Sequence, residues 1–586
     1  MPAQLQRLAL PRPGAPEGRG PAYLRGGGLV DREGGAAVVR VPAGATADLG
    51  TWLNAAPVGW WRELLDVRGV RLAVRGLGRL TVRRSGPAGQ DVVASVDLDG
   101  EHDVVVPAGG TDWAWVELGA PEGRDGVLEA ATWLLDDAED PSTRVTVVVP
   151  TFRREEDCRA QVERLTATAG AATVGRVVVV DQGGTFADAP GVRDALAAAG
   201  ERAVLLEQAN LGGSGGYGRG MVESLRWPDD PVLLLDDDAE IDLEVLRRLH
   251  VLSTLSPAPT VLGTGLLSAE RPTSLEGLTE GVEPRAFRWG PVDGVGDGVD
   301  VGAGSPSAWT FARPDDRGAY TGWWGTLAPA GAVARVGLPA PYFLKWDDAE
   351  WGLRAGRAGL RVATLPGTAV WHPTWAAKGT ISSWSAWPLH RNRLATAAAY
   401  GAGRGVLRDS LVHQVKHVLS LQYDTAALWN AALAEAVDGP GWLDGDLTAV
   451  RPRAQALLDA RPAAPAVSGG VGTGGPLALP VALVRAVTGL VPPARVRGSA
   501  GAVAVDDPAG MGWRVALGRD LVRVPDGGRL VRDPARARAL LRETWRLHRR
   551  AWSRWSALRP AYADALPTAS SERAWAGRFA ARGEGQ

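Results

Sequence analysis

The segment PVLLLDDD, residues 231–238, is an apolar run that ends in three aspartates. The run is too short for a buried helix, and its composition is typical of a buried strand. Carboxylates directly after such a strand are costly unless they bind a partner, and hard divalent cations prefer oxygen ligands. The segment therefore predicts a strand that ends in a metal site.

Three similar runs precede this segment along the chain. They are VTVVVPTF, VGRVVVVDQ and RAVLLEQAN, at residues 145–152, 174–182 and 202–210. A helical or glycine-rich stretch follows each run, so the alternation predicts a doubly wound α/β domain whose sheet is largely parallel. Ligands of such domains gather at the carboxyl ends of the strands. We assign residues 143–400 to this domain.

The flanking regions have different patterns, so the chain is predicted to be multidomain. Residues 1–142 contain short β-branched runs separated by turn residues, which predict an N-terminal β-sandwich. Residues 401–586 are rich in Ala, Leu and Arg at helical spacing, which predicts a C-terminal helical region. Five tryptophans of the first region either stack on sugar rings or pack in the core, and we favour the core. They are Trp52, Trp60, Trp61, Trp113 and Trp115.

A second acidic cluster, FLKWDDAEWGLR, occupies residues 343–354. Its two aspartates, Asp347 and Asp348, lie among aromatic residues, where partial burial raises the pKa of a carboxylate toward the range of a general base. On an extended backbone, Asp347 and Asp348 would point to opposite sides of the chain, so only one of them could face a substrate. One acidic cluster that binds a metal ion and a second that supplies a general base together predict a metal-dependent group transferase.

The aspartate triplet has the Asp-X-Asp pattern with which nucleotide-sugar transferases hold a divalent ion against a diphosphate. Alternate residues point the same way, so Asp236 and Asp238 are the expected ligands, and Asp237 faces elsewhere, toward the ribose. His372, in TLPGTAVWHPTW, is a candidate third ligand that suits Mn²⁺ at least as well as Mg²⁺. His390, in WPLHRNR, is a candidate for binding a phosphate or an acceptor hydroxyl.

A glycine-rich stretch, LGGSGGYGRG at residues 211–220, contains G-x-G-x-x-G and raises the alternative of an NAD-dependent oxidoreductase. A dinucleotide fold places those glycines after its first strand, whereas two strand-like runs of this domain come earlier. We therefore expect a loop that faces a phosphate and leads into a helix at Met221, with Arg219 near the anion.

Net charge and cysteine content limit the binding partners and the cellular compartment that we expect for the protein. The formal net charge is −2, which argues against nucleic acid as a bulk electrostatic partner. One cysteine is present, so an intramolecular disulfide is excluded, and the first residues lack the apolar core of a signal peptide. No stretch has the length and composition typical of a transmembrane helix. We expect a cytoplasmic protein.

The segment DPARARALLRETWRLHRRAWSRWSAL, residues 533–558, predicts a basic amphipathic helix with an N-cap Asp and Pro at its first position. One face is expected to carry Leu541, Trp545, His548, Trp552 and Trp555. Such a helix lies on an anionic membrane surface or packs its Trp face into the core, and both interpretations remain open.

Several blocks carry a family resemblance in order and spacing. They are PTFRRE, VDQGG, NLGGSGGYGRGM, LLLDDDAE, TGWWGT, YFLKWDDAEWGLRAG, LPGTAVWHPTW and HRNR. With them the chain resembles the mycobacterial bifunctional galactofuranosyltransferases that polymerise cell-wall galactan. The resemblance implies a type A glycosyltransferase fold, UDP-galactofuranose as donor, Mn²⁺ or Mg²⁺, inversion at the anomeric carbon, and a growing, lipid-linked galactan as acceptor. It leaves self-association and product length open.

Carried over position by position, the resemblance implies a role for each site residue. The metal would be bound by Asp236, Asp238 and His372, and Asp348 would be the base. UDP would be held by Arg153, Gln182, Asn210 and Asp237. The acceptor or sugar pocket would include Trp323, Trp324, Asp347, Trp375 and His390. A transferase for another nucleotide sugar, such as rhamnose, and a non-catalytic glycan-binding protein remain alternatives.

Overall fold

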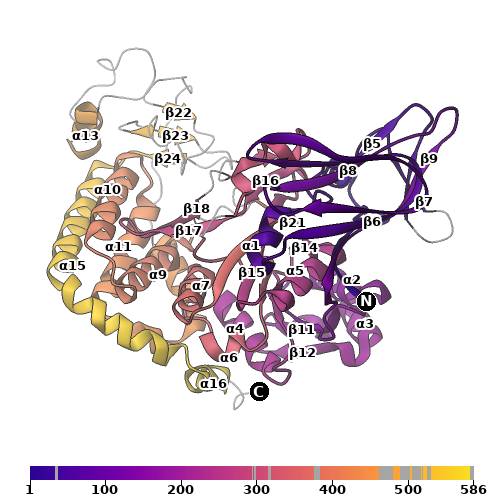
Figure 1. Ribbon diagram of the computed structural model, residues 1–586. Coiled ribbons are helices and arrows are strands. Elements are labelled where there is room, and N and C mark those ends of the chain that lie inside the picture. The colour runs from indigo at the N-terminus through magenta and orange to yellow at the C-terminus, as the bar shows by residue number, and fades with distance from the viewer. Residues whose placement is uncertain are drawn as a thin grey trace.

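The computed structural model describes residues 1–32, 37–292, 295, 298–314, 318–374, 383–460, 479–488, 502–504, 516–517, 519, 521–523 and 529–580. Three regions follow one another along the chain, as predicted: a sheet-rich N-terminal region, a central α/β region and a helical C-terminal region (Figure 1). In Figure 1 the central region lies between the other two, and its helices and strands contact both.

The N-terminal region is built on a nine-stranded antiparallel sheet, which fits the predicted β-sandwich. Its strand order is β2-β5-β8-β6-β9-β4-β3, with β1 paired to β9 and β7 paired to β6. Along β6, every second side chain is buried over most of the strand, so one face of the sheet packs on the core. The strands are β1 (Pro2–Arg7), β2 (Arg25–Gly26), β3 (Leu29–Asp31), β4 (Val38–Val41), β5 (Thr46–Asp48), β6 (Gly69–Gly86), β7 (Gly89–Pro107), β8 (Trp113–Gly119) and β9 (Gly126–Glu139).

All five tryptophans named above are buried, so the core interpretation is confirmed and sugar stacking is not supported. Trp52 packs edge-on against Trp309 of the central region, with ring centroids 5.3 Å apart. The indole nitrogen of Trp60, in helix α1 (Val58–Leu65), donates a hydrogen bond to the Ala312 carbonyl at 2.8 Å. These tryptophans therefore fix the N-terminal region against the central one.

The central sheet confirms the four predicted strands. They are β10 (Val145–Thr151), β11 (Val174–Asp181), β12 (Ala203–Glu207) and β13 (Val232–Leu234). All four are parallel, in the order β12-β11-β10-β13. The order reverses between β10 and β13, which is where doubly wound sheets bind ligands. The sheet continues through β20 (Thr326–Ala328), β15 (Thr260–Ser268), β16 (Ser274–Gly277) and β19 (Val299–Asp300), and β21 (Arg361–His372) joins β15 to β14 (Glu240–Ile241).

Helices cover both faces of this sheet, which explains why its strands are apolar throughout. In β10, Val147 and Val149 belong to a core shared with α2 (Glu155–Thr166) and α5 (Leu243–Leu255). Val148 points the other way, into a core shared with α4 (Gly212–Ser224) and α7 (Asp347–Arg357). The remaining helices of this region are α3 (Pro190–Ala199) and α6 (Ala332–Val336).

The glycine-rich stretch is a helix, so the predicted loop leading into a helix at Met221 was wrong. Helix α4 begins at Gly212, which has a φ of +71°. Its glycines let the helix approach the sheet closely: a Cβ at Gly220 would lie 2.1 Å from Val148 Cγ1. Arg219 lies over the ring of Phe579 and not at an anion site. The glycines serve packing, which also removes the basis of the oxidoreductase alternative.

The C-terminal region is helical, as predicted, and a long helix runs along its outer edge (Figure 1). Helix α9 already packs with α11 and α15 in one core, so helical packing begins before the predicted boundary at residue 400. The helices are α9 (Ala386–Ala399), α10 (Gly405–Leu419), α11 (Tyr423–Asp438), α12 (Val450–Asp459), α13 (Leu479–Thr488), α15 (Pro534–Ala569) and α16 (Glu572–Ala580). A small sheet holds β22 (Ala502–Ala504), β23 (Leu521–Arg523) and β24 (Arg529–Val531).

Helix α15 begins as predicted, because the Asp533 carboxylate accepts a hydrogen bond from the Arg536 amide. The face predicted to carry the tryptophans lies at the edge of the buried surface, so it is neither wholly packed nor wholly exposed. His548 and Trp555 are buried, whereas the side chains of Trp545 and Trp552 are exposed. Trp545 lies two residues before the buried Leu547, about 200° round the helix. Among the described residues, no helix is both long and apolar enough to span a membrane.

Candidate active site

Two aspartates and a histidine converge at the carboxyl end of β13, as predicted for a metal site. Asp236 and Asp238 follow β13, and the chain then forms β14, which pairs with the end of β21. This pairing brings His372, the last residue of β21, to the aspartates: its Nε2 lies 3.2 Å from Asp238 Oδ1 and 3.6 Å from Asp236 Oδ2. One ligand atom from each of the three lies within 4.8 Å of the others. Two carboxylate oxygens and one imidazole nitrogen are a donor set that fits Mn²⁺ or Mg²⁺.

Neighbouring side chains hold the three aspartates in place. The Tyr217 hydroxyl of α4 donates a hydrogen bond to Asp236 Oδ1 at 2.7 Å. Asp237 lines the same cavity and accepts a hydrogen bond from the Thr151 hydroxyl at 2.8 Å. That it faces a ribose stays a prediction. Burial and then the charge of Asp238 raise the pKa of Asp237 to about 7.

Arg154 contacts two of the three aspartates. Its Nη1 lies 3.2 Å from Asp238 Oδ2, and its Nε lies 3.6 Å from Asp237 Oδ1. The neighbouring Arg153 was the predicted donor ligand; its side chain is exposed and lies over the Phe152 ring. Arg153 has a φ of +56°, so the chain turns sharply after β10 and presents Arg154 to the aspartates.

Asp347 and Asp348 both line the same cavity as the metal-binding group. They occupy the first turn of α7, so the predicted extended backbone was wrong. Successive residues of a helix are about 100° apart, which allows both carboxylates to face one cavity. The preceding Lys345 and Trp346 have φ values of 70° and 72°, and this left-handed backbone directs the start of the helix into the cavity.

The two carboxylates have different partners. Asp347 Oδ2 accepts a hydrogen bond from the Ser214 hydroxyl of α4 at 3.1 Å. Burial raises the pKa of both aspartates, and the charge of Asp347 raises the pKa of Asp348 further. A carboxylate whose pKa is raised toward neutrality is suited to take a proton from a hydroxyl group.

Aromatic side chains form much of the remaining cavity wall. The cavity has a volume of about 390 Å³. Trp323 and Trp324 line it, in agreement with their predicted place in the acceptor or sugar pocket. Seven further lining residues were not predicted, although three of them lie within motifs quoted above, because a motif does not show which of its side chains face a cavity. These are Tyr217, Glu280, Trp289, Tyr320, Lys345, Trp346 and Trp384.

Two predicted donor ligands, Gln182 and Asn210, lie next to the cavity and organise the start of α4. Gln182 donates to the Gly212 carbonyl at 3.1 Å and accepts from the Leu211 amide at 2.9 Å. Asn210 Oδ1 accepts from the Gly212 amide at 3.0 Å. Both side chains therefore shape the loop between β12 and α4, and their contact with a nucleotide stays a prediction.

Two predicted acceptor residues do not join the site. His390 is buried inside the helical region, where its ring stacks on Trp429 at 3.8 Å and its Nε2 lies 3.0 Å from Ser410 Oγ. Its assignment to the acceptor pocket was wrong, because its side chain is buried among α9, α10 and α11 and does not line the cavity. Trp375 lies outside the described residues.

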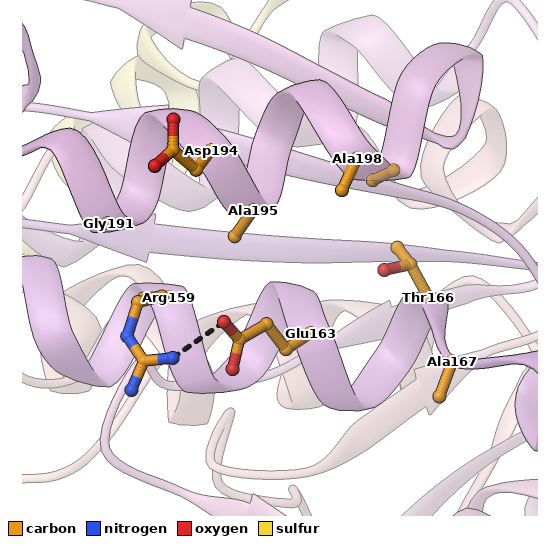
Figure 2. Close-up of a pocket in the computed structure, with 9 residues that line it drawn as sticks. Arg159, Glu163, Thr166, Ala167, Gly191, Asp194, Ala195 and Ala198 are labelled. Carbon is orange, nitrogen blue, oxygen red and sulfur yellow. Dashed lines mark hydrogen bonds and ion pairs between the residues drawn. The ribbon is translucent and has the colours of Figure 1, made fainter.

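A second hollow, of about 650 Å³, lies between α2 and α3 (Figure 2). Arg159 and Glu163 form an ion pair at 2.6 Å, and α3 presents Gly191, Asp194 and Ala195 across from them. The walls of this hollow consist mostly of alanine and glycine with one solvent-exposed ion pair, and they hold no group suited to catalysis. The chemistry is therefore assigned to the cavity that holds both acidic clusters.

Comparison with known proteins shows the family of the chain. Residues 141–393 match the model of the family described as glycosyltransferase like family 2. Galactofuranosyltransferase GlfT2 of Mycolicibacterium smegmatis is 30% identical over 97% of this chain and 95% of its own length. Galactofuranosyltransferase GlfT2 of Mycobacterium tuberculosis is 30% identical over 97% of this chain and 96% of its own length. The chain belongs to the GlfT2 family of galactofuranosyltransferases.

Solved glycosyltransferase structures resemble the chain more distantly. GalNAc-T7 with UDP, GalNAc and Mn²⁺ aligns with 45% of this chain and 49% of its own, at 10% identity and a TM-score of 0.34. The mannosyltransferase PcManGT of Pyrobaculum calidifontis, with GDP-Man and Mn²⁺, aligns with 55% of this chain and 81% of its own, at 16% identity and a TM-score of 0.31. At such low scores the family assignment rests on the full-length GlfT2 relatives. This galactofuranosyltransferase carries both predicted acidic clusters in one cavity.

Proposed function

We propose that this enzyme transfers galactofuranose from UDP-galactofuranose to a growing galactan or a related cell-envelope glycan. The observation that carries the proposal is that one cavity is lined by both a metal-binding group and a buried pair of carboxylates, in a chain related over its whole length to GlfT2. One group would hold the donor diphosphate, and the other would activate the acceptor.

On the donor side, we assign Asp236, Asp238 and His372 as ligands of Mn²⁺ or Mg²⁺. When bound, the ion supplies charge neutralisation for the diphosphate of the leaving UDP. We assign UDP binding to Arg153, Gln182, Asn210 and Asp237. These four lie at or just beyond the carboxyl ends of the parallel strands, where nucleotides bind in such sheets.

On the acceptor side, we assign Asp348 as the general base. Its carboxylate takes the proton of an acceptor hydroxyl while that oxygen attacks the anomeric carbon from the face opposite UDP. The bond between the anomeric carbon and the UDP oxygen breaks, and its electron pair leaves with UDP, so the configuration inverts. The raised pKa of Asp348, caused by burial and then by Asp347, supports this role. We assign Trp323, Trp324 and Asp347 to holding the sugar in line.

A panel of nucleotide sugars tests the identity of the donor sugar. The purified enzyme is incubated with a synthetic galactofuranosyl acceptor, Mn²⁺ and, in turn, UDP-galactofuranose, UDP-galactopyranose or dTDP-rhamnose, and products are weighed by mass spectrometry. We expect product growth with UDP-galactofuranose alone. Growth with the rhamnose donor instead would favour a rhamnosyltransferase.

We propose further that the enzyme is cytoplasmic and associates with the inner face of the plasma membrane, where a lipid-linked acceptor would lie. Support comes from exposed Trp545 and Trp552 on α15, with Arg404 and Arg408 of α10 over the Trp552 ring. Basic residues near an anionic surface contribute about 1 kcal/mol each. The full chain should therefore sediment with anionic vesicles at low salt, and Trp545→Ser with Trp552→Ser should release it. Failure of the wild type to bind would contradict this part.

A further inference from the structure

A two-stranded ribbon forms part of the cavity wall on the side of the carboxylate pair. Glu280, in β17 (Glu280–Glu283), and Trp289, in β18 (Arg288–Pro291), both line the cavity. Among the described strands, β17 and β18 pair with each other, and one isolated bridge joins Glu280 to Tyr320. A ribbon of two strands is at best marginally stable by itself. Its position at the cavity therefore depends on contacts outside the ribbon.

The open end of the ribbon is attached to the central region. The Glu280 carbonyl accepts a hydrogen bond from the Ala319 amide at 2.9 Å, and its carboxylate accepts one from the Tyr320 hydroxyl at 3.1 Å. These contacts fix one end of the ribbon. The turn at the other end, between Glu283 and Arg288, reaches the helical region.

Four side chains, Arg288, Arg393, Asp409 and His413, hold this turn, and we call them the clamp. Arg393 of α9 donates to the backbone carbonyls of Ala286 and, at 3.0 Å, of Phe287. Its guanidinium also pairs with Asp409 of α10. Asp409 Oδ2 accepts a second hydrogen bond, at 3.0 Å, from Nε of Arg288 in the ribbon, and Arg288 also contacts His413.

The Arg393–Asp409 pair is largely buried, whereas the Arg288 side chain is 47% exposed. The side chains of Arg393 and Asp409 are 7% and 12% exposed. Burial by itself would raise the pKa of Asp409, but the hydrogen bond from Arg288 and the charge of Arg393 outweigh it and lower the pKa. Asp409 is therefore a charged, partly buried link between the ribbon and two helices.

The clamped turn also contacts the segment that carries the proposed base. Phe287, whose φ is +54°, stacks on Trp346 with ring centroids 5.6 Å apart and planes 14° apart. Trp346 lines the cavity and immediately precedes Asp347 and Asp348. A shift of the turn would therefore move two parts of the wall together.

We propose that the clamp positions the acceptor side of the cavity, so that the helical region sets how tightly the acceptor glycan is held. The four clamp residues are positioning residues, because each is absent from the cavity lining and acts through Trp289, Glu280 and Trp346. The inference rests on the proposed function in one respect, that the acceptor occupies the side of the cavity next to Asp348. The proposal assigns α9 and α10 a role in positioning the cavity wall, which is separate from the roles of the residues that line the cavity.

The test separates the acceptor from the donor in steady-state kinetics of Asp409→Asn in the full chain. Loss of charge-assisted hydrogen bonds to a turn predicts that KM for a galactofuranosyl acceptor rises about tenfold. The dissociation constant of UDP with Mn²⁺, measured by calorimetry, should stay within about twofold, because the metal-binding group is held by other elements. The matched control is Asp424→Asn, which removes the Arg536–Asp424 ion pair between α15 and α11 and should leave both quantities unchanged.

A second variant and a second measurement distinguish loss of the clamp from misfolding of Asp409→Asn. Arg288→Gln removes the exposed half of the clamp and leaves the Arg393–Asp409 pair in place, so it should also raise the acceptor KM. Hydrogen exchange of residues 280–291 should quicken in both clamp variants and not in Asp424→Asn. Unchanged exchange and an unchanged acceptor KM would overturn the proposal, as would an equal loss of UDP affinity. If the wild type transfers no galactofuranose, the proposed function fails, and the exchange measurement still decides for or against the clamp.

Discussion

At the scale of single residues, the cavity has a donor side and an acceptor side. Asp236, Asp238 and His372 form one group, and Asp347 and Asp348 form the other. The two groups line one cavity, and the charge of Asp236 also contributes to raising the pKa of Asp347. A substitution in one group should therefore affect one substrate much more than the other.

The first prediction concerns the metal ligands. Asp236→Ala, Asp238→Ala or His372→Ala should lower turnover by roughly a hundredfold or more, because the charge on the leaving UDP is no longer neutralised. Calorimetry should show that Mn²⁺ no longer strengthens UDP binding. Asp229→Asn, an exposed carboxylate just before the same strand, is the control and should behave as the wild type. Full turnover of the wild type in excess chelator would contradict the metal assignment.

The acidic residues could be predicted from the sequence because their chemistry leaves few other uses for them. Three aspartates after an apolar run are costly without a partner, and the structure brings Asp236 and Asp238 to His372. The contact of Arg154 with the aspartates could not be predicted, since it depends on one left-handed residue, Arg153, after β10. His390 was misassigned because α9 is buried on nearly all sides, and sequence does not show which of its residues border the cavity.

At the scale of elements, α4 shows how glycine can determine packing without contacting a ligand. The glycine spacing matches a phosphate-binding motif. In the structure, however, the glycines allow α4 to pack closely against β10 and β11. The sequence could not separate these uses, because both need a missing side chain. The helix matters for the site, because it carries Tyr217 and Ser214 to the two acidic groups.

The second prediction tests this packing. Gly→Ala inside a helix ordinarily stabilises it by up to about 1 kcal/mol. Gly220→Ala should instead destabilise the enzyme by about 1–3 kcal/mol, because the new Cβ would lie 2.1 Å from Val148 Cγ1. Gly218→Ala is the matched control in the same helix, since its Cβ would lie 3.5 Å from Pro339, an ordinary contact. Equal effects of both changes on the urea midpoint would refute the packing role.

At the scale of the whole molecule, neighbouring regions share cores across the predicted domain boundaries. One core joins the N-terminal sheet to the central sheet, and another joins α7 to α9, α11 and α15. The order of regions was predictable from the change in hydrophobic period along the chain. The shared cores were not, because they depend on long-range contacts such as that of Trp52 with Trp309.

The helical region holds a group of four of the chain's seven histidines, three of them buried and His413 partly buried. They are His390, His413, His417 and His548, linked through Ser410 and Trp429. Burial lowers the pKa of each, to about 4 for His413 and about 3 for His417. The folded state therefore keeps them neutral at pH values where the unfolded chain takes up protons.

The third prediction is that this group makes stability depend on pH. The histidine contribution is fully present above pH 6.5, the ordinary pKa, and is lost as pH falls from 6.5 toward about 4. The raised pKa values of Asp237, Asp347 and Asp348 act in the opposite direction, so a comparison of variants is needed. The loss of unfolding free energy between pH 7 and pH 5 should be smaller in His417→Gln than in the wild type. The same pH dependence in both proteins would contradict the prediction.

The central claim is that Asp348 is the base and that the donor is held elsewhere in the cavity. The most direct measurement is turnover together with UDP affinity in Asp348→Asn, with Asp347→Asn beside it. Asn keeps the size of Asp348 but cannot accept the proton, so turnover should fall by roughly a hundredfold or more while the dissociation constant of UDP barely changes. Near-normal turnover in Asp348→Asn, or loss of UDP binding in that variant, would contradict the account.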